Sequence, residues 1–593
     1  MLRIIFGKAK SGKTYQVYSE IAKAMQTNKK TILIVPEQFT LEAEKQLIGQ
    51  LQSEGFIGLE IVSFKRLAHK VVNATDEVTL SDIGKQMLLR KLFFENQSQL
   101  SVYRKAFTKL GFIEKFSETI KELKQNRVSP LLLEGYIKDM PRNNMTAHKL
   151  SDIASIYSAL ESYKENQYSD EEDLFERFIE AIPSSDLISN SLIWLDGFDS
   201  FTLQELSVIK AMAEPAEEVS VTLCSDGKLT TALFDHTNLS FQRLTKNESG
   251  RFKLEGLNRE IPNSDIMHIA ENLQAYPYQV KAIDADVACI FASDHQLGEV
   301  TYCGSKILDL VREHDYNWND IILITNNLSA YSGYIKRTFK EMGIPFFIDE
   351  KVGVSNHPLV QLIKTYIKLF SVGLNKETVL ALVKTGFIDS NPLNIAEFEI
   401  FVLENGFSRQ KLNQLLEEDH IKLNPLVKAL DQIHYEKLRH GKIGVRVAIE
   451  AIYQMLVDLK VPVLLENYVT TFNDSGLSNE AQLFSQIWEN TMSLFDQLVE
   501  LIGEDIVTWE ELHQLLESGF DAMEIGLLPL TEEAVLIGSL DRSRSHPVKV
   551  LFFLGFNDGV IPEQGGANQL ILDSEKEWLK ENGLQLLSDS KMF

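Results

Sequence analysis

The first residues that could do chemistry form a candidate phosphate-binding loop at the N-terminus. The segment Gly7-Lys-Ala-Lys-Ser-Gly12-Lys13-Thr14 has the spacing G-x-x-x-x-G-K-[ST]. A strand-like apolar run, 1–6, precedes it, and a helix-like stretch, 15–25, follows it. The glycines let the backbone curl so that its N–H groups face phosphate oxygens, and the helix start adds its positive dipole. The predicted ATP-binding residues are Gly7, Lys8, Ala9, Lys10, Ser11, Gly12, Lys13 and Thr14.

Two side chains of this loop have specific expected roles. Lys13 reaches the β- and γ-phosphates, and the hydroxyl of Thr14 is placed to ligate Mg²⁺. The competing interpretation is an ordinary glycine turn between a strand and a helix. The pattern leaves open whether the loop hydrolyses a nucleotide or only holds one.

The elements that must position this loop are predicted to be α/β. Short β-type runs separated by helix-like stretches indicate a parallel, doubly wound sheet. A second unit of the same kind follows, and each is interrupted by a long stretch with helical periodicity. Strands are predicted at 1–6, 31–35, 58–64, 191–196 and 219–223, and in the second unit at 285–291, 320–325, 345–349, 534–538 and 548–554. The polar, turn-rich stretch 225–274 is predicted to be loop and crossover.

These stretches predict four regions. The first core is 1–67 plus 183–275, with a helical insertion at 68–182. The second core, which is incomplete, is 276–357 plus 528–593, with a helical insertion at 358–527. A chain of 593 residues is expected to contain several domains.

Composition limits the classes of protein. The 44% hydrophobic and 24% charged residues are typical of a globular protein, and no apolar run approaches the roughly 20 residues that span a bilayer. The N-terminus has no signal-peptide layout, and the three cysteines lie apart at Cys224, Cys289 and Cys303. A cytoplasmic location is therefore expected. The net charge of -25 does not exclude nucleic acid, because binding depends on a local groove.

The order of motifs resembles that of superfamily 1 helicases. The segments 34–40 and 61–67 resemble motifs that contact single-stranded DNA, and 192–199 lies where the Walker B sequence belongs. This resemblance implies two RecA-like cores and a Mg²⁺ role for Asp196. Three positions depart from it. Gly197 replaces the Glu that orients the attacking water, Thr325 replaces an Arg that reaches the γ-phosphate, and Pro547 replaces a Glu of a late motif. The resemblance therefore predicts a core that binds a nucleotide without acting as a motor.

Over essentially the whole chain, the motifs resemble the AddB family, which forms one half of the bacterial AddAB helicase–nucleases. The segments that carry this resemblance are 6–14, 35–40, 196–199, 538–544 and 555–562. It implies an AddA-type partner with motor and nuclease activity, repair of double-strand breaks, and scanning of single-stranded DNA for the Chi sequence. The family's nuclease motif and the cysteines of its 4Fe–4S cluster are missing from this sequence. Neither nuclease activity nor the cluster is expected of this chain.

Candidate DNA contacts follow from side-chain chemistry at the motifs of this resemblance. Polar side chains can hydrogen-bond base edges, while aromatic rings and arginine can stack on bases. The candidates are Gln38, Thr40, Phe64, Arg66, Phe198 and Phe201. The alternatives are core packing for the phenylalanines, a surface ion pair for the arginine and an inert loop position for the glutamine.

Two other functions stay open. The chain could be an active superfamily 1 helicase, or a structural scaffold with a vestigial phosphate loop. The acidic run 170–173 could suggest a metal site, but acids in the first turn are typical of a helix start.

Overall fold

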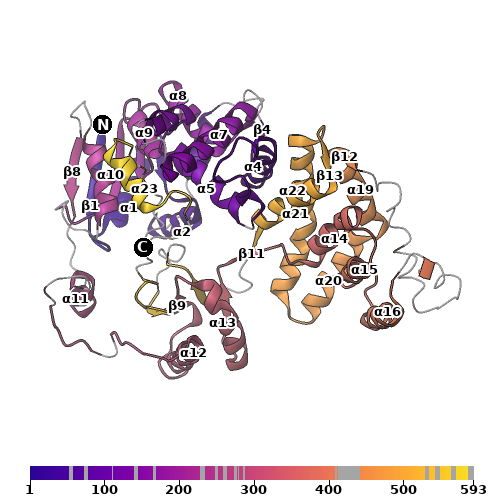
Figure 1. The fold of residues 1–593 in the computed structure, drawn as a ribbon. Helices are drawn as coiled ribbons and strands as arrows, with labels where there is room; N and C mark the ends of the chain where they lie inside the picture. The colour runs from indigo at the N-terminus through magenta and orange to yellow at the C-terminus, as the bar shows by residue number, and fades with distance from the viewer. Residues whose placement is uncertain are drawn as a thin grey trace.

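Two parallel β-sheets organise the protein, and helices surround both (Figure 1). The computed structural model describes residues 1–27, 29–51, 58–72, 78–109, 111–138, 140, 144–164, 168–227, 234–246, 252–257, 264–272, 277, 279–284, 287–407, 410, 411, 430, 441–527, 533–540, 548–561, 569–584 and 586. The predicted α/β class with two parallel sheets is confirmed. Within the described residues, no helix is both long enough and apolar enough to cross a membrane.

The first sheet has six parallel strands in the order β3-β2-β6-β7-β1-β8. All the strands predicted for the first core are present, and one further strand, β8, lies at the edge beside β1. The bounds are β1 Leu2–Gly7, β2 Thr31–Ile34, β3 Leu59–Val62, β6 Leu192–Leu195, β7 Glu218–Cys224 and β8 Phe252–Gly256.

Helices cover both faces of the first sheet, which explains why the neighbouring strands β2 and β6 are apolar without alternation. Successive side chains point to opposite faces, so Ile4 packs in one core cluster and Ile5 in the other. One face is covered by α1 Lys13–Met25 and α2 Thr40–Leu51. The other is covered by α3 Phe64–Val71, α8 Glu171–Ala181, α9 Leu203–Met212 and α10 Asp235–Thr245.

The second sheet has four parallel strands in the order β10-β15-β9-β16. Two helices, α12 and α13, pack side by side in the core cluster of this sheet (Figure 1). The bounds are β9 Ile321–Ile324, β10 Phe346–Ile348, β15 Val535–Gly538, β16 Val550–Phe553, α12 Gln296–Glu313 and α13 Leu328–Met342.

Two predictions of secondary structure are wrong. The stretch 225–274 is not only loop, because it contains α10, β8 and the helix α11 Ser264–Asn272. The signal for β8 is weak because its lysine and glutamate alternate with apolar residues at an exposed sheet edge. The predicted strand 285–291 is also wrong where the structure describes it, because 287–291 pairs with no strand.

The helices of the two predicted insertions pack into one common core. Arg90 of α4 donates from Nε to the Ser518 Oγ of α22 at 2.7 Å, and Lys91 pairs with Asp505 at 2.5 Å. The first group is α4 Asp82–Asn96, α5 Phe112–Gln125, α6 Pro130–Lys138 and α7 Met145–Lys164. The second is α14 Pro358–Val372, α15 Lys376–Val383, α16 Pro392–Asn405, α19 Val445–Asp458, α20 Val461–Asp474, α21 Ser478–Ile502 and α22 Trp509–Ala522.

The short elements tie these groups together. The helix α23, near the end of the described chain, packs on the first group, where Glu575 pairs with Lys149 at 2.8 Å. Three two-stranded sheets lie among the helices: β4 pairs with β5, β11 with β14 and β12 with β13. Their bounds, with α23, are β4 Val78–Thr79, β5 Tyr168–Ser169, β11 Lys351–Gly353, β14 Glu524–Gly526, β12 Lys442–Gly444, β13 Ile506–Thr508 and α23 Asp573–Glu581.

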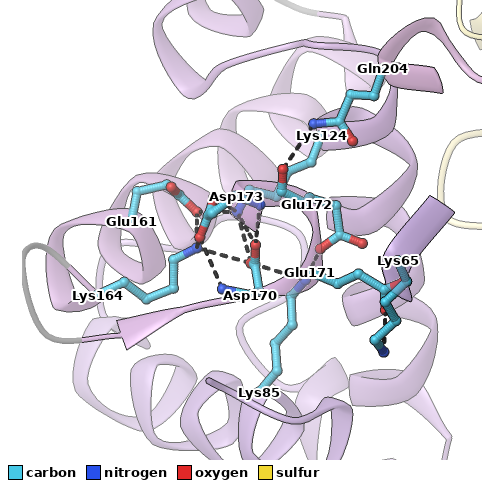
Figure 2. Close-up of polar contacts among 10 residues, drawn as sticks. All are labelled: Lys65, Lys85, Lys124, Glu161, Lys164, Asp170, Glu171, Glu172, Asp173 and Gln204. Atoms are coloured by element: carbon cyan, nitrogen blue, oxygen red, sulfur yellow. Dashed lines mark hydrogen bonds and ion pairs between the residues drawn. The ribbon is translucent and has the colours of Figure 1, made fainter. Parts of the chain in front are cut away.

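A buried ion network holds the start of α8 against the first helical group (Figure 2). Asp170 is the N-cap of α8 and lies among three buried lysines. The carboxylate is 2.7 Å from the Nζ of Lys124, 2.9 Å from that of Lys164 and 3.4 Å from that of Lys85. Asp170 and Asp173 also form a capping box, which supports the helix-start interpretation of this acidic run.

The charges in this network change the pKa values of its members in opposite directions. Burial alone would raise the pKa of Asp170, but attraction to Lys85, Lys124 and Lys164 outweighs it and holds that pKa well below its ordinary value of 3.8. For Glu172, burial is the main cause and raises the pKa, even though Lys85 acts against it. The network therefore stabilises the charged form of Asp170, whereas burial makes the charged form of Glu172 less favourable than it is in water.

We predict that Asp170→Asn destabilises the fold by about 3–5 kcal/mol at pH 7, because it leaves buried lysines uncompensated while keeping a competent N-cap. Chemical denaturation of the full chain measures this. A folded-state pKa below 3.8 means that the contribution of Asp170 is present above that pH and is lost on acidification. The difference between the two proteins should therefore narrow as the pH falls below 3.8.

Glu172→Gln is the matched control for this prediction. It should destabilise the protein much less than Asp170→Asn at pH 7, because burial makes the charge of Glu172 unfavourable whereas the lysines stabilise the charge of Asp170. Equal destabilisation by both variants would contradict the assignment of the charged centre to Asp170.

Candidate functional site

The carboxyl ends of the parallel strands bring the predicted site residues to one edge of the first sheet. The phosphate loop follows β1, Asp196 follows β6, Gln38 follows β2 and Arg66 lies in the first turn of α3 after β3. Ligands of open α/β sheets bind at this edge. The strand order places the loop at one side and Gln38 and Arg66 at the other.

The phosphate loop has the backbone that its glycines predict. Gly12, the N-cap of α1, has a φ of +95°, and Lys10 has a φ of +60°. Gly7 is required by space, since a Cβ there would lie 2.6 Å from the carbonyl oxygen of Leu257 and 2.4 Å from the Ser11 Oγ. The curled loop and the N-terminus of a 13-residue helix form an anion-binding cradle.

Lys13 folds its ammonium group back onto this loop. Its Nζ donates to the carbonyl oxygens of Gly7 and Lys8, each at 2.8 Å. Burial lowers the pKa of Lys13, while Cys224 and Asp196 act in the opposite direction. The side chain is thus held inside the loop, near the acid that ends β6. Thr14 is exposed at the start of α1, where its hydroxyl is accessible.

Asp196 is buried and oriented, and the residue after it has no side chain. The hydroxyl of Thr222 in β7 donates to Asp196 Oδ1 at 2.6 Å, which leaves Oδ2 for a further partner. Gly197 has a φ of +84°, in the region where residues other than glycine are strained. A Cβ at this position would lie 3.4 Å from Cδ of Pro36. The backbone itself disfavours a glutamate at position 197.

The polar DNA-contact candidates differ in accessibility. Gln38 is exposed in the short 3₁₀ helix η1 Glu37–Phe39, and Arg66 is exposed on α3. Arg66 Nε lies 3.7 Å from a Glu37 carboxylate oxygen, so the structure brings these two turns together. Thr40 is buried, and its hydroxyl donates to the carbonyl oxygen of Glu37 at 2.9 Å. The Thr40 hydroxyl therefore stabilises the turn at Glu37.

The three phenylalanine candidates form one aromatic cluster. Phe64 and Phe201 are 4% and 2% exposed, and both belong to the core of the first sheet. Phe198 is half-buried and packs against Phe64, with ring centroids 5.4 Å apart. The structure favours core packing for Phe64 and Phe201 and leaves Phe198 as the accessible member.

Of the two positions in the second core that differ from the helicase motifs, the structure describes only Thr325. Thr325 is fully buried at the end of β9, and its Oγ1 accepts a hydrogen bond from Asn327 N at 3.2 Å. It acts as a turn-forming residue. Pro547 lies outside the described residues.

Comparison with known proteins agrees with this geometry. Residues 4–261, which include all of the first sheet except the first two residues of β1, match the family model described as ADDB, N-terminal. Proteins named as the B-type subunit of an ATP-dependent helicase/deoxyribonuclease are similar along the whole chain. Those of Alkaliphilus oremlandii and Alkaliphilus metalliredigens are each 32% identical over 99% of this chain and 54% of their own length. That of Clostridium botulinum is 30% identical over 100% of this chain and 55% of its own length.

The chain belongs to the AddB family. It spans about half the length of the curated AddB relatives that it matches. The predicted resemblance is confirmed at the level of the family.

Sequence reasoning missed two residues that shape this AddB site. Thr222, which orients Asp196, gives no signal in the sequence except its place near the end of a predicted strand. Glu37, which pairs with Arg66, immediately precedes the candidate Gln38, and a carboxylate so near a proposed DNA contact was a usable signal.

We predict that Gly197→Ala lowers the free energy of unfolding by about 1–2 kcal/mol, because a Cβ is strained at this positive φ. Gly135→Ala is the control. It lies within α6, a Cβ there would meet nothing within 4 Å, and alanine should stabilise a helix by about 0.5–1 kcal/mol. Thermal unfolding of both variants measures the difference, and a neutral or stabilising Gly197→Ala would contradict the strain.

Proposed function

We propose that this chain is the nucleotide-holding and DNA-holding part of an AddB-type component of a helicase–deoxyribonuclease that processes double-strand DNA breaks. The names of its relatives support the class of complex. The pair formed by buried Asp196 and Gly197, whose positive φ suits glycine alone, carries the rest of the proposal, because it keeps a carboxylate that could bind a metal ion and has no side chain to orient water.

The residues present fit ATP and Mg²⁺. The cradle is one that a Cβ at position 7 would fill, and Lys13 is already held within it. Lys13 would hold the β- and γ-phosphates, while Thr14 and Asp196 would hold Mg²⁺. When bound, ATP supplies binding energy that stabilises the folded first core.

The same geometry argues against rapid hydrolysis. In-line attack on a γ-phosphate needs a residue that orients water, and losing it costs orders of magnitude in rate. Gly197 has no such group, and its positive φ disfavours any residue that has one. We infer that this AddB core holds its nucleotide and that force for unwinding comes from an AddA-type partner.

Single-stranded DNA is proposed to lie on the other side of the same edge. Gln38 and Arg66 are exposed on adjacent turns. Phe198 is half-buried in the turn after β6, the strand next to β2 in the sheet. A strand there would be held by hydrogen bonds, arginine contacts and stacking. Resemblance to AddB proteins supports Chi as the sequence that is read.

The proposed architecture is that of superfamily 1 helicases, with two RecA-like cores and a helical insertion in each. Both parallel sheets, and a phosphate loop at the first, support it. The proposed domain boundaries are those predicted from the sequence.

We predict that Lys13→Ala weakens ATP–Mg²⁺ binding by about 10- to 100-fold, the value of a lost charge-assisted hydrogen bond. Lys23→Ala, an exposed position on the same helix, is the control and should bind normally. Equilibrium binding of a fluorescent ATP analogue measures both. Equal affinity of the Lys13→Ala variant and the unmodified protein would refute the phosphate loop.

We predict that Arg66→Ala weakens binding of a single-stranded oligonucleotide and lowers the salt dependence of binding by about 0.7 in the log–log slope. Glu37→Gln should tighten binding, because it removes a negative charge beside Arg66. Lys70→Ala, on the same helix but paired with Glu60, is the control. Unchanged affinity in the Arg66→Ala and Glu37→Gln variants would place DNA elsewhere.

Two other functions give different results in the same assays. DNA-stimulated ATP hydrolysis by the purified chain would favour an active helicase. Absence of both ATP and oligonucleotide binding would favour a scaffold with a vestigial loop.

A further inference from the structure

Residues 101–109, between α4 and α5, form a loop whose inner and outer side chains differ in chemistry. Tyr103 and Phe107 are only 7% and 1% exposed, and both pack in the shared core of the helices. Arg104, Lys105 and Lys109 are exposed. The loop, called the cationic loop below, therefore turns its aromatic rings inward and its positive charges outward.

The three cations of this loop have no acidic partners, although the chain has a net charge of -25. On the two helices that the loop joins, Lys91 pairs with Asp505 at 2.5 Å and Lys124 with Asp170 at 2.7 Å. Within the residues that the structure describes, no ion pair or side-chain hydrogen bond involves the three cations of the loop. Their charges are thus available to an anion from outside the chain.

A buried carboxylate holds the first half of the cationic loop. Asp152 of α7 is 3% exposed. Its oxygens accept hydrogen bonds from the backbone N–H groups of Ser101 at 3.0 Å, Val102 at 2.7 Å and Tyr103 at 2.9 Å. The Ser101 hydroxyl donates to the same carboxylate at 3.1 Å. Hydrogen bonds to an ionised acceptor are among the stronger ones, so the backbone before the first cation is fixed.

Two side chains of the preceding segment hold the second half. Arg90 of α4 donates from Nη1 to the Phe107 carbonyl oxygen at 2.6 Å, and Gln97 donates from Nε2 to the Arg104 carbonyl oxygen at 3.1 Å. The Phe107 ring stacks on that of Phe93, with centroids 5.6 Å apart. A loop ordered in this way loses little conformational entropy when it binds. The fold therefore displays its three cations in a preorganised arrangement.

The outer face of the loop suits a double helix better than a single strand. Proteins that hold single strands combine positive charge with aromatic rings on which bases stack. Both aromatic rings of the cationic loop lie in the core, so only charges face outward. Arginine and lysine contacts to phosphates need no access to bases, which are already stacked inside a duplex.

We propose that Arg104, Lys105 and Lys109 bind the phosphate backbone of double-stranded DNA. This inference rests on the proposed function for its partner, DNA, but it uses a different site from the edge of the first sheet. Contacts to phosphates alone carry no sequence information. The cationic loop would thus hold the duplex irrespective of sequence, while strands already separated lie at Gln38 and Arg66.

Neutralising the loop tests the proposal in the full 593-residue chain. A triple variant, Arg104→Gln with Lys105→Gln and Lys109→Gln, should bind a short blunt duplex about tenfold or more weakly. Its log–log salt slope should fall by about 2 to 3, because each phosphate contact to B-DNA contributes about 0.9. Fluorescence anisotropy at several salt concentrations measures both quantities.

A second triple variant is the matched control, because it removes the same charge from exposed positions elsewhere. It combines Lys340→Gln, Lys376→Gln and Lys442→Gln, and it should keep the affinity and the slope of the unmodified chain. Equal losses in the two triple variants would trace the effect to total charge and overturn the proposal. An unchanged slope in the loop variant would overturn it as well.

A single-stranded oligonucleotide separates this inference from the proposed function. Arg66→Ala is expected to weaken binding of the single strand and to spare the duplex, whereas the loop variant should do the reverse. Duplex binding that depends on the loop, with no effect of Arg66→Ala on single strands, would refute the proposed edge site alone. The opposite pattern would refute the cationic loop alone.

Lysine acetylation of the unmodified chain gives a test that needs no variant. With duplex at about ten times its Kd, Lys105 and Lys109 should be acetylated roughly tenfold more slowly than without it. The exposed Lys340 and Lys376 should react at the same rate in both conditions. Mass spectrometry of the digested protein reads each site. Equal rates at Lys105 and Lys109 with and without duplex would overturn the proposal.

Discussion

Parallel pairing in the first sheet is the constraint on which the candidate site depends. Every strand of this sheet ends at the same edge, so turns far apart in sequence meet there. The order β3-β2-β6-β7-β1 sets their spacing: the phosphate loop and Asp196 follow strands that are separated by β7, and the Thr222 hydroxyl of β7 orients the acid. A change of register in β7 would turn that hydroxyl to the opposite face, because side chains alternate along a strand.

The same edge shows how motor chemistry could be lost while the cradle is kept, as proposed above. The loop depends on its own glycines and on α1, whereas the position after Asp196 depends on a backbone that passes close to Pro36. The two can therefore change independently. A chain that turns at Gly197 with a φ of +84° keeps its sheet and the buried carboxylate proposed to bind Mg²⁺, while this φ disfavours any residue whose side chain could orient water.

The sequence could predict those features of the fold and site that depend on residues close together in the chain. The loop, the buried strands and the helix start at Asp170 were predictable, since each depends on neighbours in sequence. β8 was not, because an exposed edge strand tolerates lysine and glutamate. Nor could the sequence separate buried Phe64 and Phe201 from half-buried Phe198, because exposure depends on how α3 and the turn after β6 pack together. The ion pair of Glu37 with Arg66 likewise joins two turns that only the sheet brings together.

The buried ion network at the start of α8 links the first sheet to the shared core of the helices. α8 packs on the first sheet through Leu174 and Phe178, while its N-cap Asp170 is held by lysines of the helical group. Lys65, one residue from Arg66, reaches Glu171 at the same helix start. A shift of the shared helical core would therefore act on α8 and on α3 together. Because separating buried opposite charges is costly, the edge proposed to bind DNA and the helical core are expected to move together.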